Sequence, residues 1–347
     1  MRIVRTIVCL TLCLLFGNIQ ASNVITYESG SEPINIGRLS QAFVDSTASL
    51  SAAEVWGNGK FEPIPLNAPN FDISNNAVWV SFTVTSDAND LCLQIAYPTL
   101  DQLILYRVGA DGVPVEMERL GESLNFDQRR YDTPAFIFDL FAESGQETSY
   151  LLRVDSKDQI LLPLVIGAKE EVLGAQWNGH ILFGLYFGII LVMFFYNLFI
   201  YLSTKDKSYF WYVIHTALVG VTQSSFQGYS FQFLWPNSSW WANQSTLVLT
   251  CGVSIVGIFF FKEFVKSKEY IPRLDKVFTG VIGAYVLLAA FSMFGDFATA
   301  YKVLQPLQGM VALSILGAAI YIAKKGYRPA QFYLLAWSLL MVGIIIF

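Results

Sequence analysis

Charged residues are scarce in this 347-residue chain, where only 14% are Asp, Glu, Lys or Arg; an ordinary soluble domain has about 25%. The shortage is uneven, because of the 22 basic and 27 acidic residues 33 precede Trp177 and only 16 follow it. With a mean hydropathy of +0.47, this predicts a soluble domain of about 150 residues followed by a membrane domain. A net charge of −5 offers no basic face for phosphates and excludes a strong nucleic-acid binder.

Cysteine and histidine are also rare, with four and two residues respectively. Two cysteines lie in the N-terminal leader, while Cys92 and Cys251 lie in different halves, so a disulfide framework is not expected. His180 and His215 are 35 residues apart and there is no CxxC pair, which argues against a structural zinc site. Walker A, GxSxG and HExxH motifs are absent as well. The chain is therefore predicted to hold no enzyme, metal or cofactor site.

The N-terminus has the three parts of a secretory signal peptide. Met1–Arg5 carries two positive charges, Thr6–Phe16 is apolar but too short to span a bilayer, and Ala21 is a small residue at a cleavage position. We expect residues 1–21 to be removed on export. Lipoprotein processing at Cys13 is the alternative, which the bulky Leu12 before it disfavours.

Six apolar stretches follow Trp177, each close to the 20 residues that cross a bilayer. Within lipid each must be helical, because only a helix satisfies its own backbone groups there. Gly228–Asn243, with its proline and tryptophans, is read as an interfacial turn between the second and third. The predicted spans are 179–202, 209–228, 244–261, 277–295, 303–323 and 330–347.

Loop charges predict the orientation of these spans. If the exported domain leads into the first helix, the cytoplasmic loops hold ten Lys and Arg residues and the outer loops hold Lys302 alone. The excess of positive charge inside agrees with the signal peptide. The chain ends at Phe347 within an apolar run, so we expect it to be truncated, with the sixth span as the last helix as the alternative.

Inside the spans, His215 is the only ionisable residue near a centre. Coupled transport needs intramembrane ionisable groups, so a transporter is disfavoured. For His215, a hydrogen bond between helices is preferred to a proton relay. Gly184 and Gly188 form a small-xxx-small face, for which close packing within the bundle is preferred to dimerisation.

The first half shows short β-rich runs bounded by turn residues, without a helical period. Together with a hairpin turn at Gly109–Gly112, the spacing predicts an antiparallel sandwich. Glu170–Gln176 then leads into the first span without a Gly/Ser linker, so a stiff junction is expected. The predicted strands are 78–84, 91–96, 103–108, 135–141, 148–154 and 160–166.

Several of these runs carry a family resemblance, together with Tyr196-Asn197-Leu198 at the end of the first span. They are Val78–Phe82, Ile95–Asp101, Leu105-Tyr106, Leu120-Gly121, Arg129-Arg130, Phe136–Phe138, Tyr150–Val154 and Leu162–Leu164. In order and spacing the chain resembles the bacterial seven-transmembrane receptors with diverse intracellular signalling modules (7TMR-DISM). Its first half resembles their type 2 extracellular domain, a jelly-roll sandwich akin to carbohydrate-binding modules.

The resemblance implies a fold class and a set of partners. An all-β jelly-roll-like sandwich, residues 22–170, would act as a periplasmic sensor, followed by an all-α polytopic bundle, residues 171–347, in the bacterial inner membrane. Its partners would be the lipid bilayer, a carbohydrate or small organic ligand, a cytoplasmic histidine kinase or diguanylate cyclase module and, as a further option, a second copy of the chain. The chain departs from the family pattern because the seventh helix and the output module are missing.

Ligand-binding candidates in the sandwich are a guanidinium pair with a neighbouring ring, Arg129, Arg130 and Tyr131, and the stacking ring of Tyr106. Forked donors beside aromatic faces suit carboxylated or polyhydroxylated ligands. A solvated loop and core packing are the respective alternatives. Trp79, in mid-strand, is expected to be a core residue rather than a sugar platform.

Two further interpretations stay open. Trp235, Trp240 and Trp241 are read first as an outer aromatic belt, with contact to the exported domain as the alternative. As a whole, the chain is predicted to be a signalling receptor. The alternative is a channel or transporter subunit with a periplasmic docking domain.

Overall fold

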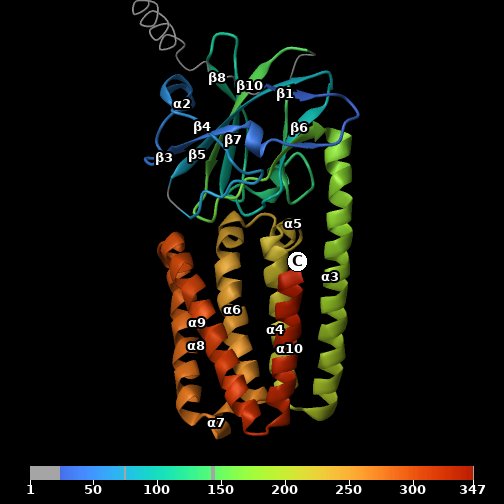
Figure 1. Cartoon of the computed structure of the whole chain (residues 1–347), viewed down its shortest axis with the longest axis vertical. Coiled ribbons are helices and arrows are strands. Elements are labelled where there is room, and N and C mark those ends of the chain that lie inside the picture. The colour runs from blue at the N-terminus through green and yellow to red at the C-terminus, as the bar shows by residue number, and fades with distance from the viewer. Residues whose placement is uncertain (1–23, 74–75, 142–144, 347) are drawn as a thin grey trace, which may run out of the picture.

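The computed structural model describes residues 24–73, 76–141 and 145–346. A β-sandwich stands on one end of a bundle of long helices (Figure 1). The predicted signal peptide, residues 1–21, lies outside the described residues.

Two sheets form the sandwich, and all strand pairs but one are antiparallel. The exception is β1, which runs parallel to the second half of β5. In the larger sheet the order is β4 (Glu62–Pro63), β3 (Gln41–Asp45), β5 (Ala77–Ser86), β10 (Thr148–Asp155), β7 (Gln102–Val108) and β8 (Pro114–Leu120), with β1 (Val24–Tyr27) beside β5. The smaller sheet has the order β2 (Ile34–Asn35), β11 (Leu164–Ala168), β6 (Leu91–Ile95) and β9 (Phe136–Asp139). The predicted all-β sandwich is confirmed.

The alternation of side chains along β5 explains where the core lies. Val80 and Phe82 point between the sheets into the main core, whereas Trp79 points to the outer face. There it is fully buried beneath α2 (Ala52–Asn58), whose start is fixed by a capping box between Ser51 and Glu54. The predicted core role of Trp79 is confirmed. The seven residues of α2 span only two turns, which is too short for a helical period to be recognised in the sequence.

One predicted strand is displaced. Residues 160–163 form a single bridge, Asn70 with Leu161, and the strand β11 begins only at Leu164. Pro163 explains the late start, because proline has no N–H to donate to a ladder. The hairpin at Gly109–Gly112 is confirmed between β7 and β8, with Gly112 at φ +76°.

Six long helices coincide with the six predicted spans. Four of them, α3, α6, α8 and α9, are long and apolar enough to cross a membrane. The long helices are α3 (Lys169–Thr204), α4 (Lys207–Phe226), α6 (Ser239–Phe264), α8 (Pro272–Phe294), α9 (Phe297–Lys324) and α10 (Arg328–Ile346); α5 (Tyr229–Phe233) and α7 (Ser267–Tyr270) are short. The loop of α7 lies at the bundle end away from the sandwich (Figure 1).

The junction between the two halves has no linker. Strand β11 ends at Ala168 and α3 begins at Lys169, so Glu170–Gln176 forms the first turns of a 36-residue helix. Helical hydrogen bonding makes this segment stiff over its length, as the sequence predicted.

The glycine face of α3 corrects a prediction. A Cβ added at Gly184 or Gly188 would meet no heavy atom within 4 Å, and both glycines line a cavity of about 690 Å³ instead of a helix contact. The close approach between α3 and α4 is at Gly220, where a Cβ would lie 3.1 Å from Ile190. The prediction of close packing at Gly184 and Gly188 is wrong, because both glycines face the open space of this cavity.

His215 lies between α4 and α6. Its ring is 3.2 Å from the position of a Cβ built on Gly257 of α6, so the imidazole fits only because that residue is glycine. Its Nδ1 is buried without a hydrogen-bond partner. The predicted hydrogen bond between helices is supported, because His215 of α4 has the backbone of Val253 in α6 as a partner.

Candidate functional site: the seam between sandwich and helices

The sandwich rests on the helices through a surface here called the seam. On the sandwich side it comprises the loops 96–101, 121–135 and 156–158; on the helical side, the start of α3, residues 227–236 with α5, and the start of α6. Any signal from one half to the other must cross the seam or the strand-to-helix junction beside it.

Two adjacent residues of the sandwich bond to different helices. The carboxylate of Asp132 accepts a 2.7 Å hydrogen bond from Nε2 of Gln232 in α5. The hydroxyl of Thr133 donates a 2.7 Å bond to Oε1 of Gln176 in α3. Because neighbouring residues are about 3.8 Å apart along the chain, a shift of this loop acts on both helices at once.

Two more hydrogen bonds hold the sandwich to the segment that leads into α6. The backbone N–H of Phe126 donates to the carbonyl of Pro236 at 2.8 Å. The side-chain amide of Asn243 donates to the hydroxyl of Ser123 at 3.3 Å. The loop 121–135 is thus attached to three separate helical segments.

Gly228 sets the close approach of the two halves. It adopts φ +77°, and a Cβ there would lie 2.7 Å from Cβ of Pro98 and 2.9 Å from Cβ of Pro134. Both prolines belong to the sandwich. Only glycine permits this backbone conformation without strain and this contact without displacement.

Arg129 is enclosed by aromatic rings. Its guanidinium carbon lies 4.6 Å from the ring centroid of Phe126, 4.4 Å from that of Phe136 and 5.6 Å from that of Phe231 in α5. Nη1 donates to the carbonyl of Pro134 at 2.8 Å, while Nε and Nη2 are buried without a partner. Burial lowers the pKa of Arg129 to about 10, so the group stays charged at neutral pH and is stabilised by the ring faces.

Arg130 and Tyr131 lie on the other side of the loop. Both donate to the carboxylate of Asp139 at the end of β9, and the side chain of Arg130 is 61% exposed. Lys169, the first residue of α3, places its ammonium 4.8 Å from the ring centroid of Tyr131. Burial, followed by the hydrogen bond to Asp139, raises the pKa of the Tyr131 phenol. This cluster ties the loop to the junction and not to a cavity.

Tyr106 belongs to neither group. It packs on the outer face of the larger sheet, with its ring centroid 6.0 Å from that of Trp79, in the small core beneath α2. The four candidates therefore occupy three surroundings and do not form one ligand site among the described residues. Arg129 is a buried structural cation, and Arg130 is the exposed member of the set.

The three tryptophans do not share one role: one contacts the sandwich and another is exposed as in an aromatic belt. Trp235 packs on the cluster that contains Phe126 of the sandwich, which is the contact given as the alternative. Trp240 is 54% exposed, as expected of a residue in an aromatic belt. Trp241 links the two, with ring centroids 6.1 and 6.3 Å from those of its neighbours.

Three carboxyl groups meet in a small cavity of about 30 Å³ at the seam. Burial, with a further contribution from Asp101, raises the pKa of Asp158 to about 6. Burial also raises the pKa of Glu122 well above its usual value and that of Asp101 to a lesser degree. From α6, Asn243 and Gln244 line the same cavity, and each has a buried side-chain oxygen without a partner. Protonated carboxyls could donate to these oxygens, which makes the cavity sensitive to pH.

No metal site accompanies this cluster: in the described ranges, no three His, Cys, Asp or Glu side chains are arranged to hold an ion. Little in the sequence pointed to the carboxyl cluster, because its members are 21 to 57 residues apart along the chain. Phe126 and Phe231 were missed for the same reason. Only the polar interruption of the apolar run at 228–243 pointed to the seam at all.

Comparison with known families agrees with this architecture. Residues 179–347 match the family model described as 7TM diverse intracellular signalling, and residues 37–168 match the model described as 7TMR-DISM extracellular 2. No curated protein matches the sequence significantly. The two matches lie one after the other and meet near the start of α3, where the structure passes from sandwich to helices. The chain thus belongs to the seven-transmembrane receptors with diverse intracellular signalling modules, and its sandwich is their type 2 extracellular domain.

Proposed function

We propose that this receptor senses a small polar ligand, a carbohydrate or an organic acid, on its sandwich and passes the signal to the helices through the seam. The sandwich would lie in the periplasm and the bundle in the inner membrane of a bacterium. A cytoplasmic kinase or cyclase module would supply the output, so that the present chain performs no catalysis itself.

One observation carries the proposal: Asp132 and Thr133, side by side in the sandwich, bond to α5 and α3 respectively. A ligand that displaces this loop changes the position of α3 relative to α5. It shifts the balance between two arrangements of the bundle only as far as its affinities for them differ. Coupling between sites is typically 1–3 kcal/mol, which is comparable to the net contribution of one or two hydrogen bonds.

Hydrogen exchange on the chain reconstituted in lipid nanodiscs tests the proposal. A panel of sugars and small organic acids is added, and exchange is followed in the sandwich and in the seam segments 170–180 and 228–236. We expect an active compound to alter exchange in both regions. In the variant Thr133→Val the sandwich should still respond, while the response in α3 is lost.

Thr83→Val is the matched control, because it removes a hydrogen bond to Ser149 that lies within the sandwich. This variant should transmit like the unmodified chain. If every binding compound changes exchange in the sandwich alone, the seam does not transmit the signal and the proposal is wrong.

A further inference from the structure

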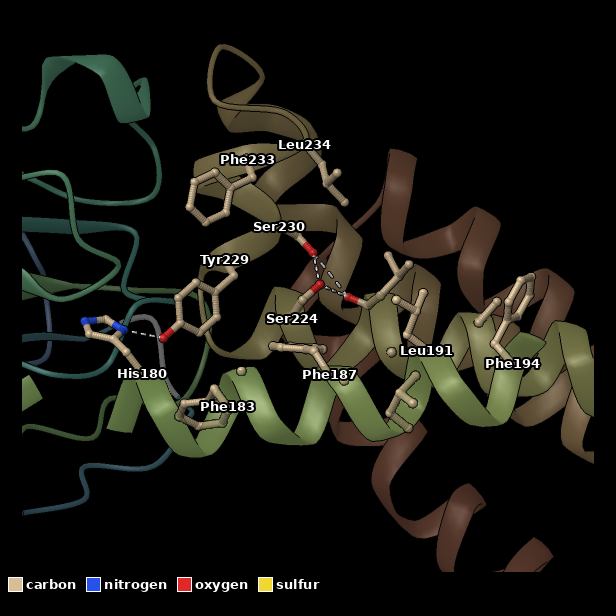
Figure 2. A pocket seen from close by; sticks show the side chains of 16 residues that line it. His180, Phe183, Phe187, Leu191, Phe194, Ser224, Tyr229, Ser230, Phe233 and Leu234 are labelled. Carbon is tan, nitrogen blue, oxygen red and sulfur yellow. Dashed lines mark hydrogen bonds between the residues drawn. The ribbon is translucent and has the colours of Figure 1, made fainter. Parts of the chain in front are cut away.

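A sizeable cavity lies between α3, α4 and α5, on the helical side of the seam (Figure 2). Its volume of about 690 Å³ falls in the range of small-molecule sites, roughly 300–1,000 Å³. The lining is apolar along most of its length, from Phe183 and Phe187 to Phe194 on α3. Gly184 and Gly188 leave it open, because neither has a neighbouring heavy atom where a side chain would stand.

A second cavity of about 310 Å³ adjoins the first beneath the sandwich. The two share His180, Phe183 and Tyr229 in their walls. The wall of this upper compartment is also mainly apolar, but it holds more polar side chains than the first, namely Gln94, Thr133, Gln176 and Gln227. Nε2 of Gln176 is buried there without a hydrogen-bond partner. A donor is thus available beside the apolar cavity.

His180 and Tyr229 mark the boundary between the compartments. Nδ1 of His180 lies 2.7 Å from the hydroxyl of Tyr229, and Figure 2 shows this pair at one end of the apolar cavity. From His180 to Phe194 the cavity follows α3 for fourteen residues, or about 21 Å at 1.5 Å per residue. One leaflet of the hydrocarbon core is about 15 Å thick. The order of polar and apolar walls is therefore that of an amphiphile standing in one leaflet.

The lining and the volume of the cavities limit the chemical class of ligand that they can bind. Asp, Glu, Lys and Arg are absent from the lining of both cavities as described, and an unpaired charge is costly to bury. The head group is therefore uncharged. The apolar cavity has room for about twenty methylene groups, if each needs roughly the 30 Å³ that a water molecule occupies. That is one acyl chain rather than two.

We propose that the paired cavities bind a single-chain amphiphile with an uncharged, hydrogen-bonding head group. Its tail lies between α3 and α4, and its head meets Gln176, His180 and Tyr229. Because Gln176 also accepts the hydrogen bond from Thr133, the occupant sits beside the link between sandwich and helices. The binding itself does not depend on the proposed signalling role.

Photolabelling of the full chain in nanodiscs tests the proposal. The probe is a monoacylglycerol with a diazirine in its acyl chain, and the labelled peptides are identified by mass spectrometry. We expect saturable labelling of peptides from α3 and α4. Unlabelled monoacylglycerol should compete, whereas the fatty acid of the same length, with its ionised head group, should compete on the order of tenfold less well.

Filling the cavity should abolish the site. Gly188→Leu and Gly184→Leu each place a side chain in open space inside the cavity, and we expect either to lower saturable labelling on the order of tenfold. Gly283→Leu in α8 is the matched control, because this helical glycine also has no heavy atom within 4 Å and lies outside the cavity. It should label like the unmodified chain.

Three results would overturn the proposal. The first is labelling of α3 and α4 that does not saturate, or that Gly188→Leu and Gly184→Leu leave unchanged. The second is equal competition by the fatty acid or by two-chain phospholipids, which would make the cavity an ordinary contact with bulk lipid. The third is cross-linking of the same α3 face to a second copy of the chain without probe labelling, which would make it a dimer contact. The competition experiment with monoacylglycerol and fatty acid uses the unmodified chain. It therefore tests the proposal even if a leucine variant fails to fold.

Discussion

The guanidinium carbon of Arg129 lies 5.6 Å from the ring centroid of Phe231, so a cation of the sandwich is held partly by an aromatic side chain of the helices. Phe126 completes the arrangement, because its ring meets that of Phe231 edge to face with centroids 5.6 Å apart. Such contacts are worth roughly 0.5–2 kcal/mol each when shielded from water. Separating the two halves would expose the charge and the rings together.

Replacement of Arg129 should therefore lower the stability of the folded chain, whether or not a ligand is present. We expect Arg129→Ala to lower the free energy of unfolding by about 2–4 kcal/mol, through lost ring contacts and an unpaired carbonyl at Pro134. Arg129→Lys should recover only part of this loss, because the lysine ammonium keeps the positive charge but lacks the planar fork of the guanidinium. Thermal unfolding of the purified chain measures the effect. An unchanged melting temperature in Arg129→Ala would contradict it.

Arg130 gives the cleaner test of ligand binding. Its side chain is 61% exposed, and its partner Asp139, 20% exposed, also accepts a hydrogen bond from Tyr131. Arg130→Ala should therefore alter stability by less than about 1 kcal/mol. Titration calorimetry against sugars and small organic acids then reports on recognition alone. If a ligand binds the unmodified chain and Arg130→Ala binds it equally well, Arg130 is not part of the site.

A side chain at Gly228 should weaken the docking of the sandwich on the helices. Gly228→Ala adds a Cβ within 3 Å of both Pro98 and Pro134 as well as a strained φ, whereas Gly326→Ala, at φ +87° with open space around it, adds the strain alone. We expect about 1 kcal/mol of destabilisation at Gly326 and a larger loss at Gly228. Protease cleavage at the seam should rise only in Gly228→Ala, and equal behaviour of the two variants would count against close docking.

Acidity should strengthen the seam. The pKa of Asp158 is about 6 in the folded protein and about 3.9 when unfolded, so the folded state binds more protons and stability is lost as pH rises from about 4 to above 6. The loss is on the order of 3 kcal/mol at most. Burial raises the pKa values of Glu122 and Asp101 as well. Further titratable neighbours of the cluster are Arg129, Asp155, Lys157, Tyr97 and Tyr301.

Asp158→Asn should flatten this pH dependence and equal or exceed the unmodified chain in stability above pH 7. Melting temperatures between pH 4 and 8 provide the measurement. Asp127→Asn, on the exposed side of a seam loop, serves as the control and should keep the slope. A slope that persists in Asp158→Asn would assign the pH dependence to other groups.

The topology is open to a direct experiment. Alkaline phosphatase fused after Asn237 should be active, and after Lys268 inactive, because ten of eleven loop Lys and Arg residues are assigned to the cytoplasmic side. The structure places Asn237 beside the sandwich and Lys268 in α7 at the opposite end of the bundle. The reverse pattern of activity would invert the assignment.

The two halves, the long helices, the sandwich class and the direct junction at α3 could all be predicted from the amino-acid sequence. Each of these follows from local composition or from a period of two along a strand, and neither needs knowledge of distant residues. Strand β5 shows the principle: Trp79, an aromatic residue in the middle of a β-rich run, was predicted to be a core residue, and it is fully buried.

Only the tertiary structure decided what those elements bring together. Arg129 and Arg130 are adjacent and chemically alike, yet one is enclosed by Phe126, Phe136 and Phe231 and the other is exposed, because their side chains leave the loop on opposite sides. Gly184 and Gly188 have the spacing of a packing face, yet they border a cavity whose other walls come from α4 and α5. Such outcomes depend on contacts between residues about 50 to 100 positions apart, which no local pattern encodes.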